Sequence, residues 1–371
     1  LIIFQQQIIT KYGYPAETHK IVTEDGYILK MHRIPRGIKH VKKKRPPVLL
    51  MHGLTFSSAD FINIYPNCSL GYILADMGYD VWIGNARGNS YSNRHISIDP
   101  NTNPRQFYNF SWHEIGSIDI PAKIDYILGV TKREKLYYIG HSQGCTIFYV
   151  MASTKPEYNK KIRLATLMAP ATFLAGTPEP FGQFFSQFDY EIQQFVDTFN
   201  IYHIPQLDFT RSFLRNLCQD DAYLALCRDI YYTIGGGFGD NTQLDKTVFP
   251  LIFQTTPSDA STKQFIHYFQ LIKSGRFRQF DYGHRKNIKI YGKKHPPDYN
   301  ISTITAPIAL YYGKNDRYVD IGDVKHTIQI LSNVVHDYLI PYEHFNHGDF
   351  LFASDVKPLL YDKIFRVMEQ Y

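Results

Sequence analysis

The five residues Gly140-His141-Ser142-Gln143-Gly144 constrain the fold more than any other feature of this chain. They follow the apolar run 136–139 and precede apolar residues at helical spacing, namely Ile147, Phe148 and Met151. A Gly-x-Ser-x-Gly pattern between a strand and a helix makes a sharp, strained turn, whose glycines let two chain segments pass closely and whose serine hydroxyl stays exposed. The order of these residues therefore predicts a strand–turn–helix unit with Ser142 as a candidate nucleophile.

Several other short apolar runs end at turn residues. These runs cover residues 48–51, 81–83, 165–169, 308–312 and 334–340. Strands that alternate with helices imply right-handed crossovers, and hence a mostly parallel sheet with helices on both faces. We expect one helix to begin at the capping box Ser111-Trp112-His113-Glu114 and a closing helix to cover 355–371. The predicted fold class is α/β.

The segment from residue 172 to residue 297 breaks this rhythm. Phe and Tyr occupy 16 of the 78 positions from Phe173 to Pro250, a higher share than the 15 % aromatic content of the chain. An aromatic-rich helical insertion can form a second core or a cap over an apolar pocket, and we favour the cap. The predicted domains are a core of 1–171 and 298–371 and a cap of 172–297. Within that cap, the run Gly235–Gly239 predicts a mobile element.

A serine hydroxyl needs a base within hydrogen-bond reach, and in this architecture the partners follow later strands in the order acid, then histidine. Asp316 lies just past the run that ends at Tyr312, whereas Asp320 and Asp323 fall at the start of the next helix, where acids usually cap. His347 follows the last predicted strand, and the glycine beside it allows a tight turn that its nearest rival, His344, lacks. Asp316 would hold the imidazole in one tautomer and stabilise its cation.

Acyl transfer also needs two backbone donors for the oxyanion. The amide of Gln143 directly follows the serine, and the loop His52-Gly53-Leu54 after an early strand offers the amide of Leu54. The chain has no Walker loop, no dinucleotide fingerprint and no His-Glu-x-x-His pattern, so we expect neither a cofactor nor a metal.

Charge and hydropathy exclude some classes of partner. The formal net charge of +6 is too diffuse to indicate a nucleic-acid partner. For the basic run Lys42-Lys43-Lys44-Arg45 we favour a solvated loop over a docking patch for anions. The apolar runs are core-strand sized, far below the ~18 residues of a membrane span. The sequence therefore predicts a soluble globular protein with no transmembrane segment.

The four cysteines lack zinc-ligand spacing and could form at most two bridges. Cys218 and Cys227 could pair only across a turn, because a straight helix would separate them by ~13 Å. Buried free thiols remain the alternative for this pair, and more so for Cys68 and Cys145.

Three Asn-x-Ser sequons begin at Asn67, Asn109 and Asn300. This is the acceptor pattern for N-glycosylation in secreted proteins, but about two such patterns would arise by chance in this composition. Cys68 is also an unusual middle residue for the Asn67 sequon. The sequons alone are therefore weak support for a secretory compartment.

Motifs along nearly the whole chain, from near residue 10 to near residue 360, match one family. They are Tyr12-Gly13-Tyr14-Pro15, Asp25-Gly26-Tyr27-Ile28-Leu29, His52-Gly53-Leu54, Gly84-Asn85-Ala86-Arg87-Gly88-Asn89, Gly140 to Gly144, Asn315-Asp316 and Asn346-His347-Gly348-Asp349-Phe350. On these residues the sequence resembles the animal acid lipase family, which includes gastric and lysosomal acid lipases and their insect relatives. The sequence departs from that family at Cys145, where threonine is more usual.

The resemblance implies an α/β-hydrolase fold, with a mostly parallel sheet and a helical cap. The implied site residues are the triad Ser142, Asp316 and His347, the oxyanion amides of Leu54 and Gln143, and the Cys218–Cys227 disulfide. The resemblance also implies a secreted or lysosomal glycoprotein that hydrolyses triacylglycerols or cholesteryl esters without a cofactor. We expect such a protein to act at a lipid–water interface as a monomer or a weak dimer.

These observations predict a serine lipase that acts through an acyl-enzyme on Ser142. One alternative is a carboxylesterase for soluble substrates, or a serine peptidase, on the same core; the aromatic cap argues against both. Another is a catalytically silent lipid-binding protein, which the intact Ser142, Asp316 and His347 in their proper order disfavour.

Overall fold

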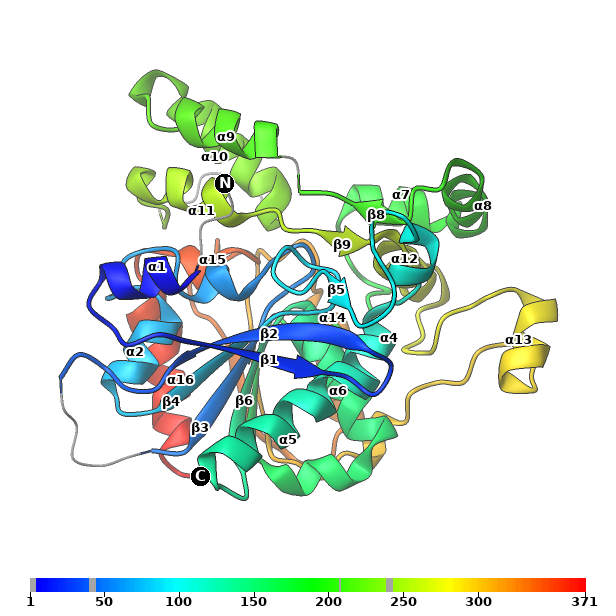
Figure 1. The fold of residues 1–371 in the computed structure, drawn as a ribbon, viewed down its shortest axis with the longest axis horizontal. Coiled ribbons are helices and arrows are strands. Elements are labelled where there is room, and N and C mark those ends of the chain that lie inside the picture. The colour runs from blue at the N-terminus through cyan, green and yellow to red at the C-terminus, as the bar shows by residue number, and fades with distance from the viewer. Residues whose placement is uncertain (1–4, 40–44, 207, 238–242) are drawn as a thin grey trace.

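The computed structural model describes residues 5–39, 45–206, 208–237 and 243–371. A sheet of nine strands occupies the centre of these described parts (Figure 1). Its main path runs β1-β2-β4-β3-β6-β7-β10-β11, and β5 pairs with β2. The strands are β1 (Glu17–Val22), β2 (Tyr27–Ile34), β3 (Pro47–Met51), β4 (Asp80–Gly84), β5 (Arg94–His95), β6 (Leu136–His141), β7 (Ile162–Met168), β10 (Ile308–Tyr312) and β11 (Val334–Leu339).

The parallel part of the sheet is the part that the sequence predicts. β4, β3, β6, β7, β10 and β11 pair in parallel, and each coincides with one of the six apolar runs. Every residue of β3, β6 and β10 is buried, because helices cover both faces of a parallel sheet. The predicted α/β fold class is confirmed.

Three strands of the nine-stranded sheet were not predicted. β1 and β2 form an antiparallel pair at one edge, and β2 also pairs antiparallel with β4. β1 alternates between half-buried and exposed residues over most of its length, so it contains no apolar run. β5 has only two residues. Apolar runs in the sequence therefore identify the parallel strands of this sheet but not its antiparallel edge.

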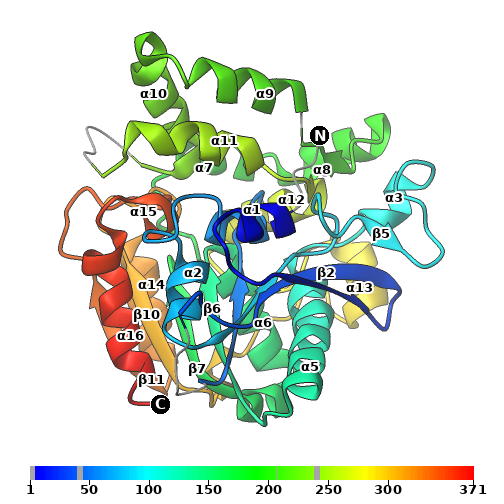
Figure 2. The ribbon, with the colours of Figure 1, turned by 60° about the vertical axis from the view of Figure 1, so that its left-hand side comes forward.

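Helices pack on both faces of the sheet (Figure 2). Those outside the 172–297 segment are α1 (Gln5–Lys11), α2 (Leu70–Asp76), α3 (Pro104–Phe107), α4 (Trp112–Glu114), α5 (Ile120–Thr131), α6 (Gln143–Thr154), α14 (Ile321–Ile330), α15 (Asp349–Phe352) and α16 (Asp362–Met368). Val48 and Leu50 of β3 pack in one hydrophobic cluster with α2 and α16, and Leu49 and Met51 pack in another with α5 and α6. The core thus lies in two layers, one on each face.

The two helices predicted at particular residues are present, each with an irregular turn. The Ser111 hydroxyl accepts from the N–H of His113, and the Ser111 N–H donates to the Glu114 carboxylate at 2.7 Å, so the capping box of α4 is complete. A π-helical turn at 115–119 joins α4 to α5. The closing helix begins with a π-helical turn at 357–361 and continues as α16.

The segment between β7 and β10 is mainly helical. Its elements are α7 (Pro180–Ser186), α8 (Asp189–Phe199), β8 (His203–Ile204), α9 (Asp208–Leu217), α10 (Leu224–Gly235), α11 (Phe249–Thr255), β9 (Ala260–Ser261), α12 (Thr262–Ser274) and α13 (His284–Tyr291). In Figure 1, α9, α10 and α11 lie above one half of the core and α7, α8 and α12 above the other, while α13 lies to the side. This arrangement suits a cap, and its exact boundaries at 172 and 297 stay a prediction.

Two predicted features fall partly outside the described residues. Gly235, Gly236 and Gly237 of the glycine run are described and buried, whereas Phe238 and Gly239 lie outside the described residues. The mobility of that run therefore stays a prediction. Lys42, Lys43 and Lys44 of the basic run also lie outside, and Arg45 forms an ion pair with Glu369 at 3.0 Å.

Candidate active site

The turn between β6 and α6 has the strained form that its sequence predicts. Ser142 lies at φ 55° and ψ −117°, a conformation that residues with a side chain rarely adopt. A Cβ added at Gly140 would lie 2.6 Å from the backbone of Gly144, and one at Gly144 would lie 2.2 Å from the Met51 carbonyl oxygen. Glycine is therefore required at both positions for β6, α6 and β3 to approach this closely.

The predicted acid and base form a buried pair. His347 Nδ1 lies 2.8 Å from Asp316 Oδ2, and both residues are about 5 % exposed or less. The other carboxylate oxygen, Oδ1, accepts from the N–H groups of Tyr318 and Val319 at 2.9 and 3.0 Å. Because the carboxylate only accepts, Nδ1 carries the proton and Nε2 of His347 is left as an acceptor.

The rival residues lie elsewhere. The Asp320 carboxylate caps α14 by accepting from the N–H groups of Gly322 and Asp323. Asp323 accepts from the N–H of Gly176, and His344 is exposed. Of the candidates weighed from sequence, Asp316 and His347 are the ones that the fold brings together.

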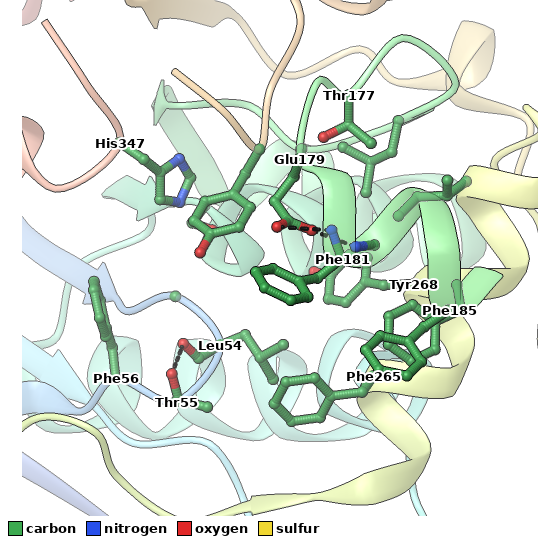
Figure 3. A pocket seen from close by; sticks show the side chains of 18 of the residues that line it. Leu54, Thr55, Phe56, Thr177, Glu179, Phe181, Phe185, Phe265, Tyr268 and His347 are labelled. Carbon is green, nitrogen blue, oxygen red and sulfur yellow. Dashed lines mark hydrogen bonds between the residues drawn. The ribbon is translucent and has the colours of Figure 1, made fainter. Parts of the chain in front are cut away.

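Ser142 and His347 line the same cavity, which has a volume of about 350 Å³. Core residues form its floor, and residues of α7 and α12 form its apolar wall and roof (Figure 3). The apolar lining residues include Leu54, Leu174, Phe181, Phe185, Phe265, Tyr268, Phe269 and Ile272. Such a cavity is in the size range of small-molecule sites and suits an apolar ligand.

Glu179 is the one acidic side chain among the described residues that line this cavity. Its carboxylate accepts from the N–H groups of Phe181 and Gly182, so it caps the N-terminus of α7 (Figure 3). The Glu179 carboxylate therefore stabilises the start of α7, the helix that carries the roof of the cavity.

The His52-Gly53-Leu54 loop approaches the serine from the end of β3. A Cβ added at Gly53 would lie 3.0 Å from Ser142 Cβ, so glycine is needed for this approach. His52 Nδ1 lies 2.8 Å from the Gly53 carbonyl oxygen, and His52 Nε2 accepts from the N–H of Ala86 at 3.1 Å. Burial lowers the pKa of His52 to about 4, which keeps the ring neutral with its proton on Nδ1.

The two predicted oxyanion amides lie beside this loop. Leu54 lines the cavity, and the residue after it, Thr55, has a left-handed φ of 59°. Gln143 is the first residue of α6, whose first N–H groups have no carbonyl partner within the helix. The role of the Leu54 and Gln143 amides as oxyanion donors stays a prediction.

Sequence reasoning missed a contact made by His141. Its Nε2 lies 3.0 Å from the His347 carbonyl oxygen, and its ring stacks on Phe56. Burial lowers the pKa of His141 well below its ordinary value, so the ring is neutral. His141 therefore joins the base loop to the serine turn, and its place in the pentapeptide was the one available signal.

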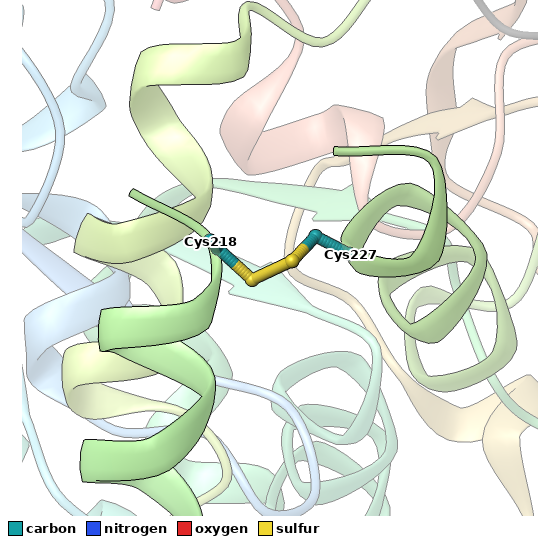
Figure 4. Close-up of a disulfide and its surroundings, with 2 residues drawn as sticks. All are labelled: Cys218 and Cys227. Carbon is teal, nitrogen blue, oxygen red and sulfur yellow. A yellow bond between two sulfur atoms is a disulfide. The ribbon is translucent and has the colours of Figure 1, made fainter. Parts of the chain in front are cut away.

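The structure contains the Cys218–Cys227 disulfide (Figure 4). The two Cα atoms lie 5.8 Å apart, because the chain turns between α9 and α10. Cys68 and Cys145 are free thiols, and burial raises the pKa of the Cys145 thiol.

Asn67, Asn109 and Asn300 are all exposed, as acceptors for a glycan must be, and their occupancy stays a prediction.

Within residues 5–39, 45–206, 208–237 and 243–371, no group of three or more His, Cys, Asp or Glu is placed to hold a metal ion. Over the same ranges, no helix has the length and apolar character needed to cross a bilayer.

The chain matches known proteins over almost its full length. Residues 46–353 match the alpha/beta hydrolase fold model, and residues 5–65 match a partial alpha/beta-hydrolase lipase region. Lipase 3 of Drosophila melanogaster is 41 % identical, over 97 % of this chain and 91 % of that protein. Gastric triacylglycerol lipase of Rattus norvegicus is 35 % identical, over 98 % and 91 %. The chain belongs to the animal acid lipase family.

As a member of this family, the acid lipase is a carboxylic ester hydrolase. Solved structures support its fold alone. Monoglyceride lipase from Saccharomyces cerevisiae has a TM-score of 0.53 at 17 % identity, over 96 % of this chain and 98 % of that one. The thioesterase domain from the curacin biosynthetic pathway has a TM-score of 0.52 at 15 % identity, over 95 % and 99 %.

Proposed function

We propose that this acid lipase hydrolyses esters of long-chain fatty acids, triacylglycerols or cholesteryl esters, through an acyl-enzyme on Ser142. One observation carries this proposal: Ser142 and His347 face one apolar cavity, and Asp316 holds the His347 ring. The gastric triacylglycerol lipases among its relatives support triacylglycerol as a substrate.

Each proposed catalytic residue has a defined step. Ser142 Oγ attacks the ester carbonyl carbon while His347 Nε2 takes its proton, and Asp316 stabilises the imidazolium that forms. The amides of Leu54 and Gln143 donate to the carbonyl oxygen as it becomes an anion. The tetrahedral intermediate expels the alcohol, which takes the proton from His347. Water then attacks the acyl-enzyme and loses a proton to His347, and His347 gives that proton to Ser142 Oγ as the fatty acid is released.

The cavity lining favours a long acyl chain. The rings of Phe181, Phe185 and Phe265 lie on its wall and roof (Figure 3). Each methylene buried against such a surface contributes about 0.8 kcal/mol, so a long chain gains far more than an acetyl group. A peptide bond with polar neighbours would leave its donors without partners there.

The cap also carries an unusual number of exposed aromatic rings. On or beside α7, α8 and α9 these are Phe181, Phe184, Phe185, Phe188, Tyr190, Phe195, Phe199, Phe209 and Phe213. The most exposed, Phe209, has 83 % of its surface accessible. Phe181 and Phe185 also line the apolar cavity, and exposed apolar rings of this kind suit adsorption to a lipid–water interface.

A secreted or lysosomal location is part of the proposal. The Cys218–Cys227 disulfide needs an oxidising compartment to form and persist, and the three sequon asparagines are exposed. Together with the gastric relatives, these features favour the secretory pathway.

The test compares Ser142→Ala with the wild-type chain on two substrates, an emulsified long-chain triacylglycerol and a dissolved short-chain ester. We expect the variant to lose a factor of ~10⁶ in kcat on both substrates with its fold intact.

We also expect an organophosphonate probe to label Ser142 in the wild-type chain. Wild-type activity that is equal or higher on the dissolved ester, with no rise at an interface, would favour the soluble esterase. Absence of labelling would favour a silent lipid-binding protein.

A further inference from the structure

The C-terminal end of the cap helix α10 faces the two loops that carry Asp316 and His347. α10 ends at Gly235, and Gly236 closes it at a left-handed φ of +67°, with its N–H donating to the Tyr232 carbonyl. The last carbonyl groups of a helix have no partner within the helix and must find one elsewhere. At α10 they find partners in the candidate active site.

Two successive carbonyl groups of this turn accept from the loops of the acid and the base. The Gly235 carbonyl accepts from the N–H of Gly348 at 2.9 Å, and the Gly236 carbonyl accepts from the N–H of Arg317 at 2.9 Å. The first donor belongs to the peptide group directly after His347, and the second to the peptide group directly after Asp316. One helix end therefore bonds to the backbone beside both residues.

The peptide group between His347 and Gly348 is also held from the opposite side. Its carbonyl accepts from His141 Nε2 at 3.0 Å, while its N–H donates both to Gly235 and to the Asn346 side-chain oxygen. His141 lies at the end of β6. The base loop is thus clamped between the strand of the nucleophile and the cap.

Packing leaves no room for a side chain in this turn. A Cβ added at Gly236 would lie 2.4 Å from the Tyr318 ring and 3.1 Å from His347 Cβ. A Cβ added at Gly237 would lie 2.8 Å from the Asn346 side chain. Tyr318 itself donates its N–H to Asp316, and its ring meets the His347 ring edge to face at 5.0 Å. A displacement of this turn would therefore also displace Asp316 and His347.

We propose that the glycine turn 235–237 of the cap positions Asp316 and His347 for proton transfer, which makes Gly236 and Gly237 positioning residues of the reaction. This inference rests on the proposed function, because it presupposes that Asp316 and His347 serve Ser142. On this basis the cap does more than cover the cavity: its α10 end completes the geometry of the site. A misplacement of about 1 Å at a catalytic group lowers the rate by about 100-fold, so a modest shift of this turn is measurable.

The experiment compares Gly236→Ala with Gly292→Ala. Gly292 closes α13 with the same left-handed conformation, φ +69°, and a Cβ there would meet nothing within 4 Å. Both variants carry the same backbone strain, and only the first displaces Tyr318 and His347. On a dissolved short-chain ester we expect kcat of Gly236→Ala to fall by about 10- to 100-fold with KM within a factor of about three. Gly292→Ala should keep the wild-type kcat.

The rate at which an organophosphonate labels Ser142 provides a second readout, because labelling also needs the base in place. We expect this rate to fall in step with kcat in Gly236→Ala, measured at a temperature well below the thermal midpoint of either variant. Should Gly236→Ala fail to fold, Gly237→Ala takes its place, because the three atoms nearest to its added Cβ all belong to the Asn346 side chain.

The outcomes separate the two proposals. Equal kcat and equal labelling rates in Gly236→Ala and Gly292→Ala, with Ser142→Ala inactive, overturn the positioning role alone. Full activity in Ser142→Ala overturns the proposed function itself. A loss confined to KM in Gly236→Ala, with labelling unchanged, would make the turn a substrate-binding element and would also overturn the positioning role.

Discussion

His52 supports this site as a neutral ring, and its role does not require it to gain or lose a proton. Its Nδ1–H donates to the Gly53 carbonyl and its Nε2 accepts from the N–H of Ala86, so the ring ties the glycine loop to the neighbouring loop. The Gly53 carbonyl and the Leu54 N–H belong to one peptide group, so the bond from His52 holds the direction of the Leu54 N–H, the proposed oxyanion donor. The residue acts through its hydrogen bonds, and burial keeps it neutral by lowering its pKa to about 4.

We therefore predict that His52→Ala lowers kcat by about 10²- to 10³-fold, close to the loss of one oxyanion donor, because the Leu54 amide is no longer held in place. KM for a dissolved ester should change little, since the acyl cavity is untouched. Steady-state kinetics on that ester provide the measurement. His344→Ala is the matched control: His344 is exposed beside the base loop, and its removal should leave kcat unchanged. A large loss in His344→Ala would instead restore it as the rival base.

At the scale of helices and strands, the predictable parts are those whose residues interact locally. The six parallel strands follow from short apolar runs, which are largely buried except in the edge strand β11, and the turn at Ser142 follows from two glycines that no larger residue could replace. Asp316 and His347 were predicted because each lies in the loop that follows a strand, β10 for Asp316 and β11 for His347. β1, an edge strand with alternating exposure, and the two-residue β5 carry no such signal.

Contacts between distant elements were out of reach of the sequence. Nothing in the glycine run predicts that two of its carbonyl groups accept from the backbone beside Asp316 and His347. The two N–H donors lie more than 80 positions further along the chain. Backbone hydrogen bonds of this kind leave no trace in residue type. The His141 side-chain bond to the His347 carbonyl was missed because its acceptor is a backbone group more than 200 positions away.

The disulfide gives a prediction for the cap elements. It closes a short loop of sequence separation 9 between α9 and α10, and loop-closure entropy assigns such a bridge about 2 to 3 kcal/mol of stability. The double variant Cys218→Ala/Cys227→Ala should lose this amount in the free energy of unfolding, measured by urea titration. Cys68→Ala, which removes a half-buried free thiol, is the control and should lose less than about 1 kcal/mol. A loss below about 0.5 kcal/mol in the double variant would mean that packing alone holds α10 against α9.

For the whole molecule, buried titratable groups set how stability depends on pH. Burial lowers the pKa of His32 to about 3 and of His52 to about 4, and it lowers the pKa of His141 and His267 well below the ordinary value. These rings charge in the unfolded chain below its pKa of about 6.5 but stay neutral in the folded chain. Stability is therefore greatest above pH 6.5 and falls as pH decreases, by up to about 1.4 kcal/mol per pH unit for each ring.

Asp60 works in the opposite direction. It is buried where the core meets the cap, and its carboxylate accepts from the Thr256 hydroxyl and from the N–H of Ser57. Burial raises the pKa of Asp60 to about 6, so between pH 6 and the unfolded value of about 4 the folded state binds more protons than the unfolded state. Over that range this group makes the protein more stable as pH falls, which offsets part of the loss from the histidines.

We predict that Asp60→Asn makes the acid side of the stability curve steeper. Between pH 6 and pH 5 the wild-type carboxyl returns up to about 1.4 kcal/mol, and the variant lacks this compensation. Urea unfolding at pH 5, 6 and 7 measures the difference, and its informative quantity is the slope with pH, because loss of one acceptor for Ser57 lowers the stability of the variant at every pH. Asp99→Asn, at an exposed loop carboxyl, should keep the wild-type slope. Parallel curves for the wild type and Asp60→Asn would show that Asp60 stays charged in the fold, and the cap–core contact at Thr256 would then be insensitive to acid.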